Sequence, residues 1–324
     1  MDSVLVTGGA GYIGSHACKA LRRAGYLPVA FDDLSGGHAG AVQWGPLVRA
    51  SLLDGDAVSA AIAEHAPVAV MHFAGVIAVG ESMHDPGRHY VRNVAASAIL
   101  LRAMQQAGVD AMVFSSSAAV YGEAVTETIL ESARLAPLSP YARSKVMVER
   151  MLEDFSVAHG MRAVSLRYFN AAGADADGDT GEGHEPETHL VPLAIRAALG
   201  RAPALAVFGD DYGTPDGTCL RDYIHVTDLA EAHVRALERL RVGALPPCLN
   251  LGAGRGASVR EVIATVGLIC GREVPFTVAP RRPGDAPRLV ADISLARDTL
   301  GWTPRHSSLD EIVRTARAWE EKAG

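Results

Sequence analysis

The chain has 324 residues and a formal net charge of −7, and its 48% hydrophobic and 21% charged residues are typical of a soluble globular protein. No basic run is present to neutralise phosphates, and no apolar stretch is long enough to span a bilayer, so we expect neither a nucleic-acid nor a membrane partner. The length accommodates two adjoining cores.

Short β-branched runs alternate with longer helical segments through the first half of the chain. In chain order, we predict a strand at 4–7, a helix at 13–24, strands at 28–31 and 68–72, a helix at 90–107, a strand at 111–115, a helix at 140–159 and a strand at 163–167. This alternation predicts a Rossmann-type α/β fold, a doubly wound parallel sheet with helices on both faces.

The second half of the chain is more irregular. Residues 173–187 are rich in Gly, Asp and Glu and predict an exposed loop, and residues 201–217 predict turns with brief strands. Two capping-box patterns, Ser258 with Glu261 and Ser308 with Glu311, predict helix starts. We place a domain boundary near residue 170 and expect later segments to return to the first domain.

The four cysteines, Cys18, Cys219, Cys248 and Cys270, fit neither a metal-binding spacing nor a dense disulfide framework. We therefore expect unpaired thiols in a reducing cytoplasm, and no metal site.

A glycine-rich turn, Gly8-x-x-Gly11-x-x-Gly14, follows the first predicted strand and opens the first predicted helix. Glycines there permit a tight turn and close approach of a pyrophosphate to the backbone, and the helix N-terminus offers free N–H groups. Asp32 or Asp33 ends the next strand, at the usual distance for a carboxylate that grips a ribose diol. The combination predicts an NAD site rather than an NADP site. The alternative is a solvated Asp pair that caps a turn.

Tyr141 and Lys145 lie four residues apart on a predicted helix that Ser139 and Pro140 open, so their side chains share one face. A nearby ammonium lowers the pKa of a phenol, which predicts a general base in Tyr141. Serines 115–117 end the preceding strand, where ligands lie in open α/β sheets. The alternatives are an exposed helix face and a polar turn.

Several segments together carry a resemblance that spans residues 3 to about 320: VTGGAGYIGSH, HFAG, FSSSAAVYG, SPYARSK, LRYFNAAGA, DGTCLRDYIHV, NLGAG and APRRPGD. With them the chain resembles the extended short-chain dehydrogenases/reductases, and specifically the UDP-glucose 4-epimerases among them. The resemblance implies that Ser117 hydrogen-bonds the sugar 4-hydroxyl, that Tyr141 is the acid/base, and that Lys145 binds the nicotinamide ribose. It also implies an NAD-binding domain at 1–170 and a UDP-sugar-binding domain at 171–324.

The resemblance further implies two sets of binding residues. The NAD contacts are expected at Gly8, Gly11, Tyr12, Ile13, Gly14, Asp32, Asp33, Leu34, Ser51, Leu52, Phe73, Ala74, Gly75, Asn93, Ser115, Tyr141, Lys145 and Tyr168. The UDP-sugar contacts are expected at Ser117, Tyr141, Phe169, Asn170, His189, Leu190, Val207, Phe208, Arg221, Tyr223, Arg282 and Asp285. We expect Tyr121 and His225 to be structural.

Four positions depart from the family pattern. Ile77 replaces a lysine beside the cofactor, Ser51 replaces an aspartate near the adenine, and His189 replaces an asparagine found in some members. Leu289 stands where the family limits the size of the substituent at sugar C2.

The implied activity is that of an isomerase that interconverts UDP-glucose and UDP-galactose by transient oxidation at C4 with resident NAD, in galactose or other carbohydrate metabolism. The alternatives are a 4-epimerase of another UDP-sugar (an N-acetylhexosamine, a pentose or a uronate), a 4,6-dehydratase and a non-catalytic NAD sensor. Ala118 and Ala119 after Ser117 disfavour the dehydratase, and the Tyr141–Lys145 pair disfavours the sensor. The resemblance also implies a homodimer formed through the helices at 90–107 and 140–159.

Overall fold

A seven-stranded parallel sheet forms the larger part of the molecule. The computed structural model describes residues 1–123, 126–282 and 285–323, and its main sheet has the strand order β10-β6-β5-β4-β1-β2-β3 with every neighbouring pair parallel. The strands are β1 (Ser3–Thr7), β2 (Leu27–Asp32), β3 (Leu47–Arg49), β4 (Ala69–His72), β5 (Ala111–Ser115), β6 (Arg162–Tyr168) and β10 (Cys248–Leu251). The predicted doubly wound fold is confirmed.

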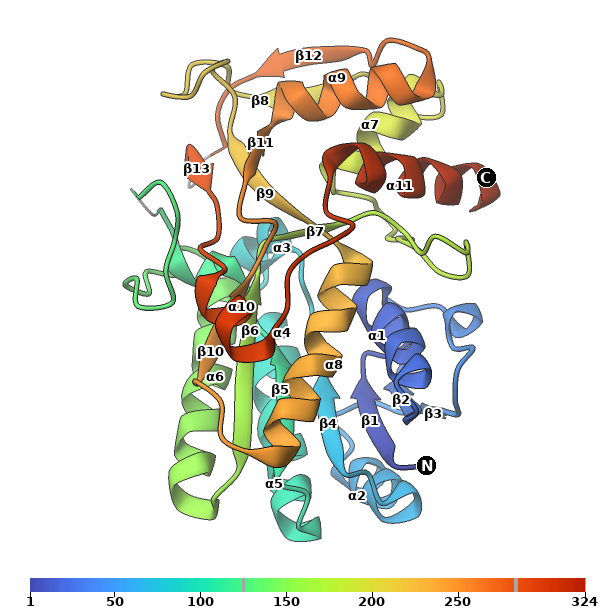
Figure 1. The fold of residues 1–324 in the computed structure, drawn as a ribbon, viewed down its shortest axis with the longest axis vertical. Coiled ribbons are helices and arrows are strands. Elements are labelled where there is room, and N and C mark those ends of the chain that lie inside the picture. Colours follow the sequence, from blue (N-terminus) through green and yellow to red (C-terminus); the bar gives the residue numbers. More distant parts are fainter. Residues whose placement is uncertain (124–125, 283–284, 324) are drawn as a thin grey trace.

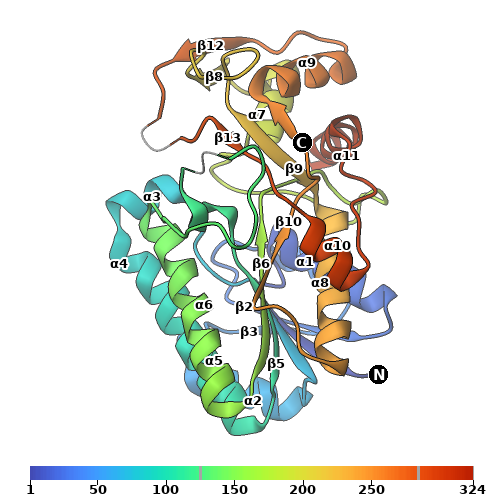
Figure 2. The ribbon, with the colours of Figure 1, turned by 60° about the vertical axis from the view of Figure 1, so that its left-hand side comes forward.

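Helices cover both faces of this sheet (Figures 1 and 2). One face carries α1 (Tyr12–Arg23), α8 (Val226–Val242) and α10 (Ser294–Leu300), and the other carries α2 (Gly55–His65), α5 (Ala96–Ala107) and α6 (Pro140–His159). Side chains of a strand alternate between faces, so Val4 and Val6 pack under α1 and α8 while Leu5 packs under α2 and α5. Strand β1 is buried on both faces, and its three central residues, Val4 to Val6, are all apolar.

A smaller unit lies above the carboxyl ends of these strands (Figure 1). Its strands are β7 (Asn170–Ala172), β9 (Leu220–His225), β11 (Gly256–Ser258) and β13 (Arg288–Leu289), with β8 (Leu205–Phe208) paired to β12 (Phe276–Ala279). Its helices are α7 (Leu190–Ala198), α9 (Val259–Cys270) and α11 (Leu309–Ala323). Val191, Ile195, Val262 and Ile312 contribute to its separate core.

Residues after 170 contribute to both units. At His225 strand β9 runs directly into α8, which packs on α1, and β10 then pairs with β6 at the edge of the main sheet. Helix α10 also packs on β10. The boundary at residue 170 between an NAD-binding and a UDP-sugar-binding domain stays a prediction.

Local signals fix several helix starts. The Ser139 hydroxyl accepts from the Ala142 N–H at 3.1 Å and begins α6, and Ser258 and Glu261 form the full reciprocal capping box of α9. The second predicted box is half formed. Ser308 accepts from the Glu311 N–H at the start of α11, but the Glu311 carboxylate contacts His306 instead.

Two sequence expectations need correction. The helix predicted at 90–107 begins with a wider π-helical turn, Tyr90–Ala95, before α5, and the short helices α3 (Val79–His84) and α4 (Pro86–His89) precede it. The loop predicted at 173–187 is partly buried, because Asp175, Thr180 and Glu182 pack inward. Among the described residues, no helix has both the length and the apolar character needed to cross a bilayer.

Candidate active site

The glycine turn between β1 and α1 is shaped for close approach of a ligand to the backbone. Gly8 has φ +73°, and a Cβ on Gly14 would lie 2.1 Å from the Gly8 carbonyl oxygen, so neither position tolerates a side chain. Helix α1 begins after Gly11, which has no side chain to cap the first-turn N–H groups. The turn therefore leaves donors and a helix N-terminus for an anion such as a pyrophosphate.

The structure distinguishes the two predicted aspartates. Asp32 accepts from the Ala10 N–H at 3.0 Å and from the Leu34 N–H at 2.8 Å, which ties the end of β2 to the glycine turn. Burial raises the pKa of Asp32, although both N–H groups oppose this shift. Asp33 forms an ion pair with Arg92 at 2.5 Å, and Leu34 takes φ +62°. Asp32 is therefore the carboxylate that borders the turn.

Ser117, Tyr141 and Lys145 gather where β5 ends and α6 begins. The Lys145 ammonium lies 5.8 Å from the centre of the Tyr141 ring and donates to the Ser115 carbonyl oxygen at 2.8 Å. Burial raises the pKa of Tyr141, and a hydrogen bond with Ser117 lowers it. Burial also lowers the pKa of Lys145 to about 8, against the opposing charge of Glu149. The predicted lowering of the Tyr141 pKa by Lys145 is therefore not found, because burial of the phenol outweighs its polar contacts.

Polar bridges hold the edges of this site. The Asn93 side chain hydrogen-bonds to the N–H and the carbonyl oxygen of Val76, and to the Ser144 hydroxyl at 3.0 Å. A Cβ on Gly75 would lie 3.0 Å from the Asn93 side-chain oxygen. The Ser115 and Tyr168 hydroxyls lie 2.6 Å apart. His72, which the sequence analysis did not single out, bridges the Thr7 and Ser97 hydroxyls. Its position at the end of a strand, in the HFAG segment, was the signal that could have identified it.

A buried ion pair supports the reactive residues from behind and was also missed. Glu149 accepts from both Nε and Nη2 of Arg167, at 2.9 and 2.7 Å, and from the Ser116 hydroxyl at 2.6 Å. Arg167 also donates to the Tyr121 hydroxyl, and the Tyr121 side chain is buried. Glu149 follows Lys145 by four residues, so the helical repeat alone places both on one face of α6.

Four expected substrate residues come together in the smaller unit. Arg221 donates to the Ala286 carbonyl oxygen at 2.8 Å and pairs with Asp285 at 3.4 Å. Arg282 pairs with the other oxygen of Asp285 at 3.0 Å and stacks 4.6 Å over the Phe208 ring. This cluster combines two cations with an exposed aromatic face. Pro283 and Gly284 of the APRRPGD segment lie outside the described residues.

The other substrate-side residues lie on neighbouring elements. Asn170 pairs in register with Tyr223 across β7 and β9, and Val207 is buried in β8. Phe169 packs in one apolar cluster with Leu289. His189 precedes Leu190 at the start of α7, and its imidazole bonds to Glu182 rather than to the Arg221 cluster.

The remaining cofactor-side residues line the carboxyl edge of the main sheet. Phe73 follows β4 and stacks 4.7 Å from His233, and the Ala74 N–H lies 2.7 Å from where a Gly8 Cβ would be. Tyr12 donates to the Gly173 carbonyl oxygen at 2.6 Å, and the neighbouring Ile13 is partly buried. The Ser51 hydroxyl accepts from the Leu53 N–H, and Leu52 is buried.

Ile77, the residue that replaces a family lysine, is 44% exposed and lies at the surface. His225 is buried, and it accepts from the Thr227 N–H at the start of α8 as a packed residue, as expected.

Residues 4–252 match the family model described as NAD dependent epimerase/dehydratase family. A UDP-glucose 4-epimerase of Azospirillum brasilense is 52% identical over 98% of this chain and 91% of its own length. The NAD complex of UDP-glucose 4-epimerase from Brucella ovis is 50% identical, with a TM-score of 0.95 and 98% of both chains covered.

A third relative was solved with a sugar nucleotide. UDP-glucose-4-epimerase from Stenotrophomonas maltophila, with bound NAD and formylated UDP-arabinopyranose, is 42% identical, with a TM-score of 0.96 and 100% and 99% coverage. The glycine turn, the Tyr141–Lys145 pair and these matches together show that the chain belongs to the NAD dependent epimerase/dehydratase family.

Proposed function

We propose that this chain interconverts UDP-glucose and UDP-galactose by inverting the configuration at sugar C4. The observation that carries the proposal is the grouping of Ser117, Tyr141 and Lys145 at the same carboxyl edge of the sheet as the glycine turn. A phenol, a hydroxyl and an ammonium so placed suit reversible proton transfer at a sugar hydroxyl. The relatives named UDP-glucose 4-epimerase support the choice of reaction.

The residues at the glycine turn fit NAD, since a Cβ at Gly8 or Gly14 would fill the space that a pyrophosphate requires. In this proposal the first-turn N–H groups of α1 hold the pyrophosphate, Asp32 accepts from the adenosine ribose, and Lys145 donates to the nicotinamide ribose. The other expected cofactor residues border these three points. When bound, NAD supplies the reversible acceptor for the C4 hydride.

Tyr141 performs the proton chemistry. Acting as the phenolate, whose charge the Lys145 ammonium stabilises, Tyr141 takes the proton of the sugar 4-hydroxyl, which Ser117 holds by a hydrogen bond, and later returns that proton to the same oxygen. The sugar would turn over between the two proton transfers and so present its opposite face to the cofactor site. Lys145 is held by the Ser115 carbonyl, which keeps its charge beside the phenol in both steps.

The smaller unit holds the UDP group in this proposal. Arg221 and Arg282 supply the cations that an acidic chain needs to bind a diphosphate, and Phe208 offers a flat apolar face to the nucleotide. Binding energy from the UDP retains the 4-keto sugar while it turns over. Asp285 already orients both arginines before any ligand binds.

A UDP-pentose 4-epimerase is the second candidate, favoured by the formylated UDP-arabinopyranose in the Stenotrophomonas structure. Leu289, which packs in one cluster with Phe169, stands at the position that the resemblance assigns to limiting the substituent at sugar C2, so it is the residue expected to discriminate N-acetyl sugars. Comparing kcat/KM for UDP-galactose, UDP-arabinopyranose and UDP-N-acetylgalactosamine separates these activities. Leu289→Tyr should reduce only the use of the N-acetyl sugar.

The decisive experiment is incubation of the purified chain with UDP-galactose and no added NAD. Resident NAD predicts that UDP-glucose appears at a stable equilibrium ratio, without net formation of NADH. Lack of conversion of any UDP-sugar, with NAD supplied, would contradict the proposal.

We also propose that two copies associate through the π-helical turn and α6, and that the protein works in the cytoplasm. Val91 is 49% exposed and Met147 42% exposed on these elements, which leaves apolar surface for a partner copy. All four cysteines are free, as in reducing compartments. Light scattering of a Val91→Glu/Met147→Glu variant, which should be a monomer, tests the association.

A further inference from the structure

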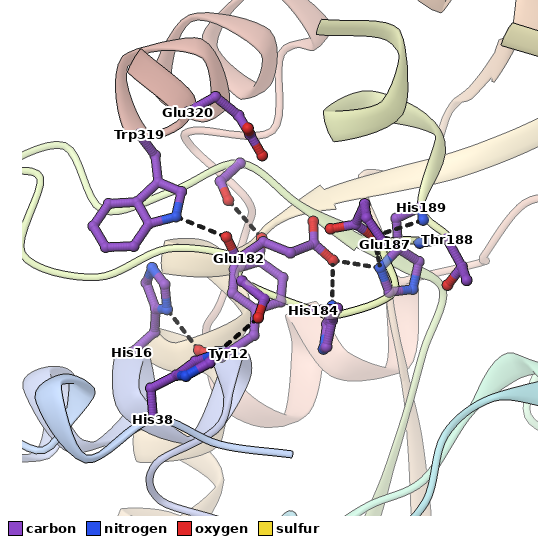
Figure 3. A network of polar contacts seen from close by, with 12 residues as sticks. Tyr12, His16, His38, Glu182, His184, Glu187, Thr188, His189, Trp319 and Glu320 are labelled. Carbon is purple, nitrogen blue, oxygen red and sulfur yellow. Dashed lines mark hydrogen bonds and ion pairs between the residues drawn. The ribbon is translucent and has the colours of Figure 1, made fainter. Parts of the chain in front are cut away.

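Four metal-binding types of side chain meet in the segment that precedes α7. Glu182, His184, Glu187 and His189 each place one ligand atom within 4.8 Å of the other three, and Figure 3 shows their side chains converging. The spacing Glu-x-His-x-x-Glu-x-His was readable in the sequence, where no metal site was expected.

The two imidazoles converge on one carboxylate. Glu182 Oε1 contacts His184 Nδ1 at 3.0 Å and also contacts His189 Nδ1, which lies 3.5 Å from Glu187 Oε1. The Glu182 side chain is 6% exposed. Nitrogen and oxygen donors are therefore already gathered around a common centre, with both carboxylates shielded from solvent and both imidazoles partly exposed.

One carboxylate oxygen of Glu187 is buried without a hydrogen-bond partner among the described residues. Its side chain is 2% exposed, one oxygen accepts from the N–H groups of Thr188 and His189, and the other is enclosed and lacks a hydrogen-bond partner among the described residues. The carboxylate lies near that of Glu182 (Figure 3). Two buried carboxylates side by side are costly unless a cation or a proton lies between them.

We propose that Glu182, His184, Glu187 and His189 bind one divalent transition-metal ion of the zinc type. Zinc takes four nitrogen or oxygen ligands at about 2.0–2.2 Å, so small side-chain movements would bring all four atoms into contact with one ion. Mixed imidazole and carboxylate donors favour zinc over magnesium or calcium, which prefer oxygen alone. This site goes beyond the proposed epimerase activity and does not rest on it.

A second acidic cluster, in the same loop, differs from the proposed metal site because a lysine already neutralises it. Asp175, Asp177 and Asp179 also converge, but the Lys19 ammonium lies 2.6–2.8 Å from all three and already supplies their positive charge. In the four-residue site, by contrast, one carboxylate oxygen has no partner among the described residues.

Surrounding contacts hold the backbone of the site in place. Trp319 Nε1 donates to the Glu182 carbonyl oxygen at 2.7 Å, and His38 Nε2 contacts the Gly183 carbonyl oxygen at 2.8 Å (Figure 3). These residues come from α11 and from the loop after β2, so several elements position the ligands before metal binds. Such outer contacts are a regular part of metal sites.

The test is titration of the chelator-treated, full-length chain with Co²⁺, which reports nitrogen and oxygen coordination by its visible absorption. We expect one Co²⁺ per chain, displaced by Zn²⁺, and at least tenfold weaker binding by His184→Gln and Glu187→Gln. His306→Gln is the matched control, because His306 contacts Glu311 in a similar pair but belongs to no candidate metal-binding group among the described residues, and it should bind as the parent does. Resident NAD and circular dichroism verify folding of each variant.

Zn²⁺ should also raise the melting temperature of the parent chain and of His306→Gln, but not of His184→Gln. The proposal is overturned if the parent shows no stoichiometric Co²⁺ absorption, or if folded His184→Gln and Glu187→Gln bind Co²⁺ as the parent does. None of these measurements depends on turnover, so they stand apart from the test of the epimerase activity.

Discussion

Glu149 and Arg167 form a two-pronged ion pair directly behind the reactive residues, with side chains only 6% and 7% exposed. Removing one partner of a buried pair leaves an uncompensated charge, which costs about 3–5 kcal/mol. We therefore expect Glu149→Gln to lower the free energy of unfolding by about that amount, measured by urea denaturation. Glu153→Gln, which breaks an exposed pair with Arg150 on the same helix, should cost less than about 1 kcal/mol. Equal effects of the two variants would contradict this view of Glu149.

Tyr141→Phe removes the phenolic oxygen that is proposed to move the proton. General acid–base groups contribute about 10²–10⁴-fold, so kcat should fall by at least about 100-fold. The NAD content should not change, because the glycine turn is untouched. Tyr26→Phe, at the opposite end of the sheet, is the control and should keep full turnover. An active Tyr141→Phe variant would show that another group is the base.

Gly14→Ala should empty the cofactor site. The added Cβ would lie 2.1 Å from the Gly8 carbonyl oxygen, so the turn must open and the N–H groups must move. We expect the purified variant to carry at least tenfold less NAD, measured after acid release. Gly40→Ala has open space around its Cβ and should keep the parent's NAD content. Retention of NAD by Gly14→Ala would mean that the turn does not hold the pyrophosphate.

Acid should destabilise the protein through buried histidines. Burial lowers the pKa of His72 to about 3, and those of His16, His225 and His233 to about 4, from 6.5. Below pH 6.5 these histidines therefore bind protons in the unfolded chain but stay neutral in the folded chain. The free energy of unfolding falls for this reason as the pH drops from 6.5 towards 4. Asp222, whose pKa burial raises to about 6, opposes part of this loss.

His72→Gln isolates one of these protons. Glutamine can still bond to Thr7 and Ser97 but does not titrate, so the slope of unfolding free energy against pH should decrease by about 1.4 kcal/mol per pH unit near pH 5. Urea denaturation at half-unit intervals of pH measures the slope. An unchanged slope would show that His72 takes up its proton in the folded chain.

The sequence alone determined the class of fold and the residues of its reactive edge. The glycine spacing, the apolar strands and the caps at Ser139 and Ser258 are local signals, and each depends on neighbours within a few residues. Parallel strands present their carboxyl ends at one edge, so the strand-end positions of Gly8, Asp32 and Ser117 along the sequence place all three at that edge. The family resemblance supplied the role of each residue in the reaction. The chemistry of the individual side chains does not reveal those roles by itself.

Only the tertiary structure decided which polar groups are buried and what pairs with them. It joined Asp32 to the glycine turn by a hydrogen bond and paired Glu149 with Arg167. Burial raised the pKa of Tyr141, where Lys145 was expected to lower it. The tertiary structure also buried Asp175, Thr180 and Glu182 within a loop that the sequence predicts to be exposed. Burial and long-range pairing depend on residues far apart in the chain, whereas periodicity and spacing report only on near neighbours.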